Sequence, residues 1–264
     1  MPLSQKISDI LPYLRRYARA LTGSQSTGDA FVTATLEAAL ADPALKRSFD
    51  DGRVAVYKAF NKVWSSAYLD VDANDGQTNG HEAAANQRLG AITPLNRQAL
   101  LLTTVEEFSS AQAAEIMDLQ PGDVDQLVNE AIKEIERESS TNVLIIEDEP
   151  LISMQLEDIV ASLGHQICGT AATRTQAGEV AAQNDVGLVL ADIQLADGSS
   201  GLDAVEDILS MGNVPVIFIT AYPERLLTGD RPEPTYLVTK PFQERAVCAA
   251  ISQALFFNSG TPAS

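Results

Sequence analysis

The chain has 264 residues, enough for one large domain or two modest ones with separate cores. Hydrophobic residues make up 45% of it and charged residues 20%, a composition that excludes disordered, collagen-like and coiled-coil proteins. The formal net charge of -18 repels phosphate backbones and anionic lipid. Bare nucleic acid and membrane surfaces are therefore poor partners for it.

Cysteine and histidine are too few and too scattered to build a site. The two cysteines, Cys168 and Cys248, and the two histidines, His81 and His165, lie far apart in the sequence, which supports neither a disulfide framework nor a zinc site. No run approaches the roughly 18 apolar residues of a membrane span, and the start of the chain lacks the order of a secretory signal. We expect a cytoplasmic protein with no membrane partner.

The first part of the chain, to about residue 140, has helical periodicity. Apolar residues recur at three- and four-residue spacing, as in Leu11, Leu14 and Ala18, and strand signals are nearly absent. A polar stretch at residues 70–82 is predicted to be a linker. It divides this part into two predicted all-α domains, residues 1–69 and 83–138.

After Thr141, short apolar runs alternate with helix-length segments. The runs predict five strands, at Val143–Ile146, Gln166–Gly169, Leu188–Ala191, Val216–Thr220 and Tyr236–Val238. Amphipathic helices are predicted to begin near Pro150, Thr173, Gly201, Pro223 and Gln243. Such a repeat builds a parallel sheet covered on both faces, so residues 141–264 are predicted to form a doubly wound, flavodoxin-like α/β domain. The fourth helix should be short or irregular, because residues 222–233 have little helical periodicity.

Acidic, hydroxyl and basic side chains stand where these strands end. They are Glu147, Asp148 and Glu149 after the first strand, Asp192 after the third, Thr220 in the fourth and Lys240 after the fifth. The carboxyl ends of parallel strands meet at one edge of a sheet, so these side chains should lie together. Converging carboxylates suit a hard ion such as Mg²⁺. With an ion, a lysine and a hydroxyl beside it, an aspartate can attack phosphorus and form an acyl phosphate.

The segments around these residues resemble the signature of two-component receiver domains. They are Ile145-Ile-Glu-Asp-Glu-Pro150, Leu188-Val-Leu-Ala-Asp192, Val216-Ile-Phe-Ile-Thr-Ala221 and Thr239-Lys-Pro-Phe242, and the resemblance spans residues 141–258. It implies that Asp192 is the phosphoryl acceptor. It also implies that Glu147 and Asp148 hold Mg²⁺ with help from Asp192 and the Gln194 backbone.

The same resemblance assigns the switch. Thr220 falls on the switch hydroxyl, Tyr236 on the switch aromatic residue, and Lys240 on the lysine that pairs with the phosphoryl group. Glu147 departs from the commonest receiver pattern, which has Asp at that position, but it keeps the acidity.

Residues 93–137 have the spacing of a helix-turn-helix bundle. The helices are predicted at Thr93–Leu102, Ser109–Met117 and Pro121–Ile135. This segment resembles region four of extracytoplasmic-function (ECF) sigma factors. Leu11–Thr22, Gly28–Leu40 and Val54–Leu69 resemble their region two.

The third of these helices departs from a DNA-reading helix. Its predicted exposed positions are Asp123, Asp125, Gln126, Asn129 and Glu130, where base and phosphate contacts need mainly cationic and amide groups. A basic run, Arg15, Arg16 and Arg19, is the main contrary feature. The pattern predicts a sigma-like framework that proteins recognise and DNA does not.

A sigma-like half followed by a receiver resembles the PhyR family of bacterial general stress response regulators over essentially the whole chain. The resemblance implies that the phosphorylated protein captures an anti-sigma factor of the NepR type and frees the ECF sigma factor. A sensor histidine kinase or phosphotransferase would supply the phosphoryl group. The chain would not be an enzyme, beyond at most autophosphatase activity.

Two other classes of function remain open. A response regulator could bind promoter DNA or RNA polymerase directly through the helix-turn-helix-like half, which the acidic third helix disfavours. An enzyme could use the carboxylates for phosphatase or kinase chemistry on another substrate. That class lacks a phosphate-cradling loop, because Gly198-Ser-Ser-Gly201 is too short and misplaced for one.

Overall fold

A computed structural model describes residues 3–74, 93–137, 139–195, 198, 200–221, 223 and 234–259. The chain divides into two compact units, residues 1–130 and 131–264, and each is described by itself. No helix within the described ranges is both long and apolar enough to cross a membrane.

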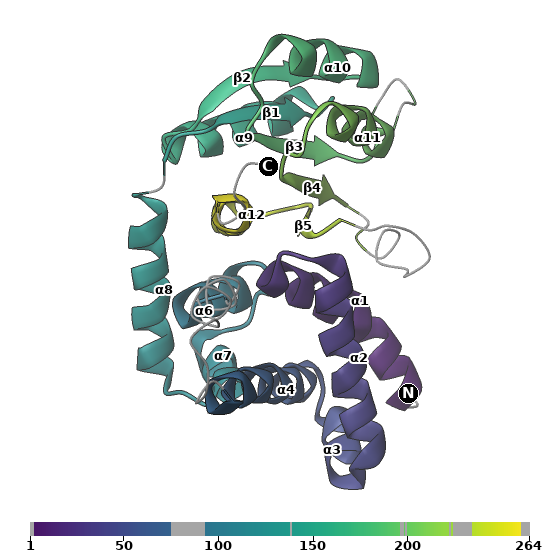
Figure 1. Cartoon of the computed structure of the whole chain (residues 1–264), viewed down its shortest axis with the longest axis vertical. Coiled ribbons are helices and arrows are strands. Elements are labelled where there is room, and N and C mark those ends of the chain that lie inside the picture. Colours follow the sequence, from purple (N-terminus) through teal and green to yellow (C-terminus); the bar gives the residue numbers. More distant parts are fainter. Residues whose placement is uncertain are drawn as a thin grey trace. The chain divides into compact units, whose positions relative to one another are not determined.

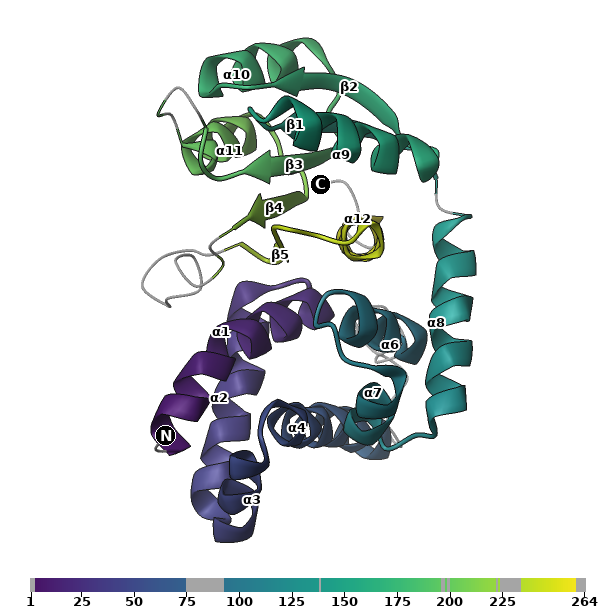
Figure 2. The ribbon, with the colours of Figure 1, turned by 180° about the vertical axis from the view of Figure 1, so that it is seen from behind.

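The first unit is entirely helical over its described residues (Figures 1 and 2). Its elements are α1 (Leu3–Thr22), α2 (Gln25–Ala41), α3 (Pro43–Ser48), the 3-10 turn η1 (Phe49–Asp51), α4 (Arg53–Asn74), α6 (Leu95–Thr104), α7 (Ser110–Met117) and α8 (Pro121–Ile135) as far as Glu130. Polar caps begin several of them: Ser24 accepts a bond from the Thr27 amide, and Ser109 forms a capping box with Gln112. The three predicted helix-turn-helix segments correspond to α6, α7 and α8.

Close packing of α1 on α2 forms one side of this unit. A Cβ on Gly28 would lie 2.7 Å from the Arg19 backbone nitrogen, so a glycine lets the two helices approach. Aromatic side chains fill the space between α1, α2 and α4. Trp64 is 2% exposed and stacks on Phe60, and it packs edge-on against Phe31.

The linker was predicted at residues 70–82, but its predicted start is too early. Helix α4 continues to Asn74, because no glycine or proline interrupts the chain before Gly76. Residues 75–82 lie outside the described residues. The boundary between the compact units falls within α8, at Glu130, earlier than the predicted start of the α/β domain at Thr141.

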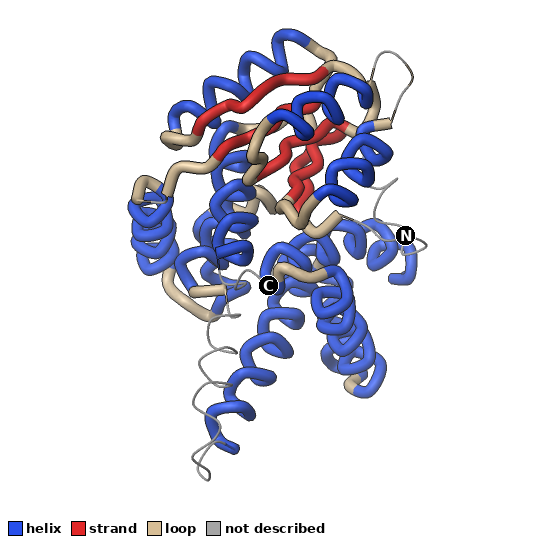
Figure 3. Tube along the Cα trace, turned by 45° about the horizontal axis from the view of Figure 1, so that its top comes forward, coloured by secondary structure: helices blue, strands red, loops and turns tan. Residues whose placement is uncertain are grey.

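The second unit contains a five-stranded parallel sheet in the order β2-β1-β3-β4-β5. The strands are β1 (Asn142–Ile146), β2 (Gln166–Ala171), β3 (Leu188–Asp192), β4 (Val216–Thr220) and β5 (Tyr236–Thr239). Helices α9 (Pro150–Ser162) and α12 (Glu244–Ser259) cover one face, and α10 (Arg174–Gln183) and α11 (Gly201–Met211) cover the other (Figures 1 and 3). The predicted doubly wound fold is confirmed.

The central strands are apolar on both faces because helices cover both. All five residues of β3 are buried, as are Val143–Ile146 of β1. The strand order reverses direction between β1 and β3, and the carboxyl ends at such a switch point form the usual crevice for chemistry. Apart from Pro223, the predicted irregular fourth helix at residues 222–233 lies outside the described residues.

Candidate functional site

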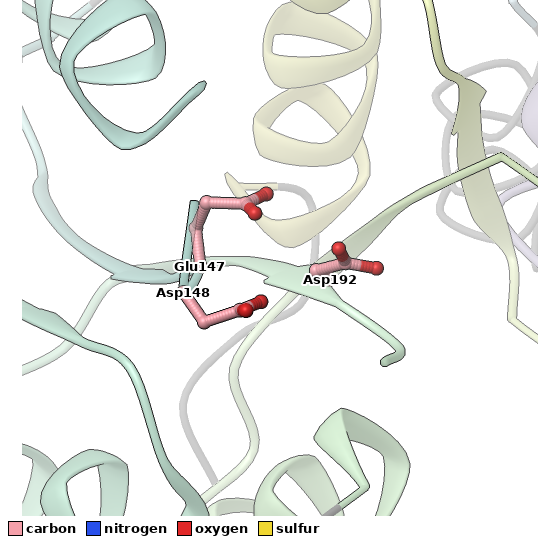
Figure 4. A group of neighbouring side chains, drawn as sticks. All are labelled: Glu147, Asp148 and Asp192. Atoms are coloured by element: carbon pink, nitrogen blue, oxygen red, sulfur yellow. The ribbon is translucent and has the colours of Figure 1, made fainter. Parts of the chain in front are cut away.

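The ends of β1 and β3 bring three carboxylates together. Glu147 and Asp148 directly follow β1, and Asp192 is the last residue of β3. Each offers an oxygen, and these atoms all lie within 4.8 Å of one another. Figure 4 shows Glu147 and Asp148 side by side on the chain after β1, with Asp192 across from them. The predicted clustering of these residues is confirmed by the geometry.

Lys240 bridges two of these carboxylates. Its Nζ lies 2.8 Å from Glu147 Oε2 and 2.7 Å from Asp192 Oδ2. The backbone reinforces this position, because the Lys240 amide donates a 2.7 Å hydrogen bond to the Thr220 carbonyl. The end of β5 is thereby fixed beside the end of β4, with the lysine aimed along the sheet edge.

The lysine is the counterion of two carboxylates, and all three side chains are largely shielded from water. The Glu147 side chain is 0% exposed, and those of Lys240 and Asp192 are each 10% exposed. Burial raises the pKa of Glu147, and nearby Asp192 adds to the rise, while Lys240 opposes it. For Lys240, burial alone would lower the pKa, but its bonds to Asp192 and Glu147 raise it overall. The lysine therefore remains a cation at neutral pH.

The Asp192 carboxylate is oriented from its other side by backbone donors. Its Oδ1 accepts bonds from the amides of Ile193, at 2.5 Å, and Gln194, at 3.2 Å. Close packing holds this turn, because a Cβ on Gly201 would lie 1.7 Å from the Asp192 carbonyl oxygen. Only glycine fits there, and its amide donates to the Ile193 carbonyl. Asp192 is thus fixed on both oxygens.

A pocket of about 430 Å³ opens over these groups. Its lining comprises Asp148, Glu149, Asp192, Gln194, Leu195, Thr220, Ala221 and Lys240. Thr220, which is 4% exposed, reaches this pocket from the end of β4. The predicted switch residue Tyr236 does not line it: Tyr236 begins β5 opposite Ile217 and is 6% exposed.

The donor set fits a hard divalent ion. Three carboxylates converge at one edge, and oxygen donors of this kind suit ions that keep several waters. Lys240 bonds to Glu147 and Asp192, whereas Asp148 lines the open pocket. Asp148 is therefore the carboxylate best placed to begin such binding.

In the helical unit, the exposed face of α8 is acidic and polar as the sequence predicted. The residues are Asp123, Asp125, Gln126, Asn129 and Glu130, all of them exposed. The basic run in α1, however, is turned inward. Arg15 and Arg19 both bind Asp29, at 2.9 and 2.7 Å, and Arg16 binds Glu106 at 2.9 Å. The cations that argued for DNA binding are paired with carboxylates inside the protein, which periodicity alone did not reveal.

Fold and site together define a two-component response regulator: a receiver domain preceded by a sigma-like helical half. Family models agree along the chain. The sigma2 domain of PhyR matches residues 7–61, the sigma-like domain of response regulator PhyR matches 89–138, and the response regulator receiver domain matches 143–252. The chain belongs to the PhyR family.

Individual relatives support this membership over the whole length. The phyllosphere-induced regulator PhyR of Methylorubrum extorquens is 52% identical, with 97% of this chain and 96% of that protein covered. The crystal structure of response regulator PhyR from Brucella abortus is 47% identical with a TM-score of 0.84, covering 98% of this chain and 96% of that one. That of anti-anti-sigma factor PhyR from Bartonella quintana is 50% identical with the same TM-score, covering 98% and 97%.

Replacing Lys240 tests its role as counterion. In Lys240→Met, Glu147 and Asp192 lose their shared cation, so we expect the receiver to lose about 3–5 kcal/mol of unfolding free energy at pH 7. The pKa of Glu147, already raised by burial, would rise further without the lysine. A carboxyl with a raised pKa in the folded state destabilises the protein only while ionised, so the loss should shrink as the pH falls.

Urea unfolding at pH 7 and pH 5 measures this effect. The matched control is Arg174→Gln, which removes an exposed cation that pairs with Asp207 in the same domain. Its unfolding midpoint should hardly change. Equal midpoints for Lys240→Met and the unaltered protein would show that the carboxylates do not need the lysine.

Proposed function

We propose that this chain is a phosphorylation-activated regulator that captures an anti-sigma factor of the NepR type and so frees an ECF sigma factor for general stress transcription. One observation carries the proposal: a sigma-like framework whose α8 exposes an acidic face stands on the same chain as a receiver site. The Bartonella quintana relative is described as an anti-anti-sigma factor. The place of action would be the cytoplasm.

Asp192 is the proposed phosphoryl acceptor, with a sensor histidine kinase or phosphotransferase as donor. A carboxylate oxygen of Asp192 forms a bond to phosphorus while the phosphorus–nitrogen bond of the donor histidine breaks, and the leaving imidazole takes up a proton. Lys240 then exchanges its contact with Asp192 Oδ2 for a phosphoryl oxygen and keeps its contact with Glu147. Thr220 supplies the hydroxyl that detects the new group.

Mg²⁺ is the proposed cofactor, held by Glu147, Asp148, Asp192 and the Gln194 backbone. When bound, it would neutralise phosphoryl oxygens during transfer. The longer Glu147 side chain already reaches Lys240 at 2.8 Å, so its part in ion binding would be weaker than that of Asp148. Any hydrolysis of the acyl phosphate would be limited to the chain's own phosphoryl group, which is not turnover on a separate substrate.

Control of capture is proposed to follow from the added charge. Phosphorylation places further negative charge at the edge of β3 and recruits Thr220 and Lys240 toward it. Tyr236, buried at the start of β5, is the proposed second member of the switch. The unphosphorylated receiver would hold the sigma-like surface unavailable, and the phosphorylated one would expose it. If phosphorylation changes the free-energy difference between the two forms by about 3 kcal/mol, the ratio of exposed to unavailable surface changes more than a hundredfold.

Acceptor chemistry can be tested with a small phosphodonor and Mg²⁺. Intact-mass analysis should show one added phosphoryl group on the full chain and none on Asp192→Ala, because Asp192 is the pocket-lining carboxylate that hydrogen-bonds to Lys240. Asp203→Ala, which changes an exposed carboxylate of α11 in the same domain, should be labelled as the unaltered chain is. Labelling of Asp192→Ala would exclude the assignment.

Capture can be tested by titrating a labelled NepR-type protein against the full chain with and without beryllofluoride, an acyl-phosphate mimic. We expect at least tenfold tighter binding with beryllofluoride, since only the activated receiver would expose the surface. Asp192→Ala should bind weakly in both conditions. Equal affinity with and without the mimic would contradict control by the receiver, and no binding in either condition would contradict capture itself.

A further inference from the structure

Glu106 is a fully buried carboxylate in the helical unit, remote in sequence from the receiver site. It lies between α6 and α7 and is 0% exposed. Its neighbour Glu107 has the left-handed backbone angle φ of +56° and is exposed. The turn therefore directs one of two adjacent carboxylates inward and leaves the other in water.

Three side chains from the region-two-like helices converge on this carboxylate. Arg16 of α1 donates from Nε to Glu106 Oε1 at 2.9 Å. From α4, Arg53 Nη2 donates to Oε2 at 2.8 Å and the Tyr57 hydroxyl donates to the same oxygen at 2.7 Å. Burial, together with the Glu106 charge, raises the pKa of Tyr57 well above its usual value, so the phenol keeps the proton it donates.

The same arginines also hold the backbone of the turn. Arg16 Nη2 donates to the Val105 carbonyl and Arg53 Nη2 donates to the Glu106 carbonyl, each at 2.9 Å. The Arg53 guanidinium carbon lies 4.5 Å from the centre of the Phe108 ring. We call this set, Arg16, Arg53, Tyr57 and Glu106, the Glu106 cluster. Helices α1 and α4 of the region-two-like segment thereby bind the turn that joins α6 to α7 in the region-four-like segment.

A second cluster in this unit also pairs one carboxylate with two arginines, but it does not link the two sigma-like segments. Asp29 binds two arginines, Arg15 and Arg19, but all three residues lie on α1 and α2. These two ion pairs therefore lie within the region-two-like segment. The Glu106 cluster joins α1 and α4 to the α6–α7 turn, which residues 75–92 separate in the sequence. Loss of the Glu106 carboxylate would leave the guanidinium groups of Arg16 and Arg53 without their shared counter-charge.

We propose that Glu106 is a positioning residue that fixes the region-four-like helices on the region-two-like helices, so that a sigma-recognising partner meets both as one preformed surface. This inference rests on the proposed capture of an anti-sigma factor. A preformed surface binds more tightly because the partner does not have to order its two parts. Glu106 would act through Arg16, Arg53 and Tyr57 and would not itself contact the partner.

The test compares Glu106→Gln with Glu107→Gln in the full chain with beryllofluoride. Both variants remove one carboxylate charge from adjacent positions of one turn, but only the first removes the ion pairs. Amide hydrogen exchange in α7 should become at least tenfold faster in Glu106→Gln and stay unchanged in Glu107→Gln. Asp29→Asn should instead speed exchange in α1 and α2 and leave α7 unchanged.

Affinity for a labelled NepR-type protein provides the second readout. We expect Glu106→Gln to bind at least tenfold more weakly and Glu107→Gln within about threefold of the unaltered chain, with one factor of ten equal to about 1.4 kcal/mol. Tyr57→Phe keeps the charge and removes one hydrogen bond, so it should weaken binding in the same direction by less. It also serves if Glu106→Gln does not fold.

The outcomes separate this inference from the proposed function. If the unaltered chain does not bind the anti-sigma protein, capture is wrong. If the unaltered chain binds and Glu106→Gln matches it in exchange and affinity, the positioning role is wrong. Equal losses of affinity in Glu106→Gln and Glu107→Gln would also overturn it, because the effect would then come from the charge of the turn and not from the ion pairs.

Discussion

Two carboxylates at the edge of one sheet share a single buried ammonium group, and the receiver's chemistry depends on that arrangement. Parallel strands necessarily bring their carboxyl ends together, so Glu147, Asp148 and Asp192 would repel one another without a cation. Lys240 supplies it from the end of β5, at 2.8 Å from Glu147 and 2.7 Å from Asp192. The charge that offsets this repulsion is also the charge that a transferred phosphoryl group would need.

In the helical unit the arrangement is reversed: one carboxylate is shared by two cations. There, carboxylates neutralise arginines that a DNA-binding protein would present outward: the partly exposed Asp29 pairs with Arg15 and Arg19, and the buried Glu106 pairs with Arg16 and Arg53. The exposed face of α8 carries carboxylates and amides. The net charge of the whole chain is -18, and in this unit too the described surface of α8 is acidic while the arginines of α1 are paired with carboxylates. A sigma-like framework with these surfaces suits recognition by protein more than by nucleic acid.

Much of this could be predicted from the sequence, because the strongest signals are periodic. The apolar runs at Leu188 and Val216 predicted β3 and β4 where they occur, and strand topology placed Asp192, Thr220 and Lys240 at one edge. The predicted start of the linker at residue 70 was wrong because polar composition does not end a helix when glycine and proline are absent, and α4 continues to Asn74. The partners of buried charges could not be predicted, since Arg16 and Glu106 are brought together only by tertiary packing.

Two sites on one chain are coupled in this account, and thermodynamic linkage makes the coupling reciprocal. If the acyl-phosphate mimic strengthens binding of the anti-sigma factor by some factor, the anti-sigma factor must strengthen binding of the mimic by the same factor. The two affinities are measured independently, by titrating different ligands into the same full chain. Neither depends on the mechanism by which the receiver and the sigma-like half communicate.

The most direct measurement is the affinity of the full chain for beryllofluoride, at fixed Mg²⁺, with and without a saturating NepR-type protein. We expect at least tenfold tighter binding of beryllofluoride when the NepR-type protein is present, equal to the gain in anti-sigma affinity that beryllofluoride produces. An affinity for beryllofluoride that the anti-sigma protein leaves unchanged would contradict control of capture by phosphorylation.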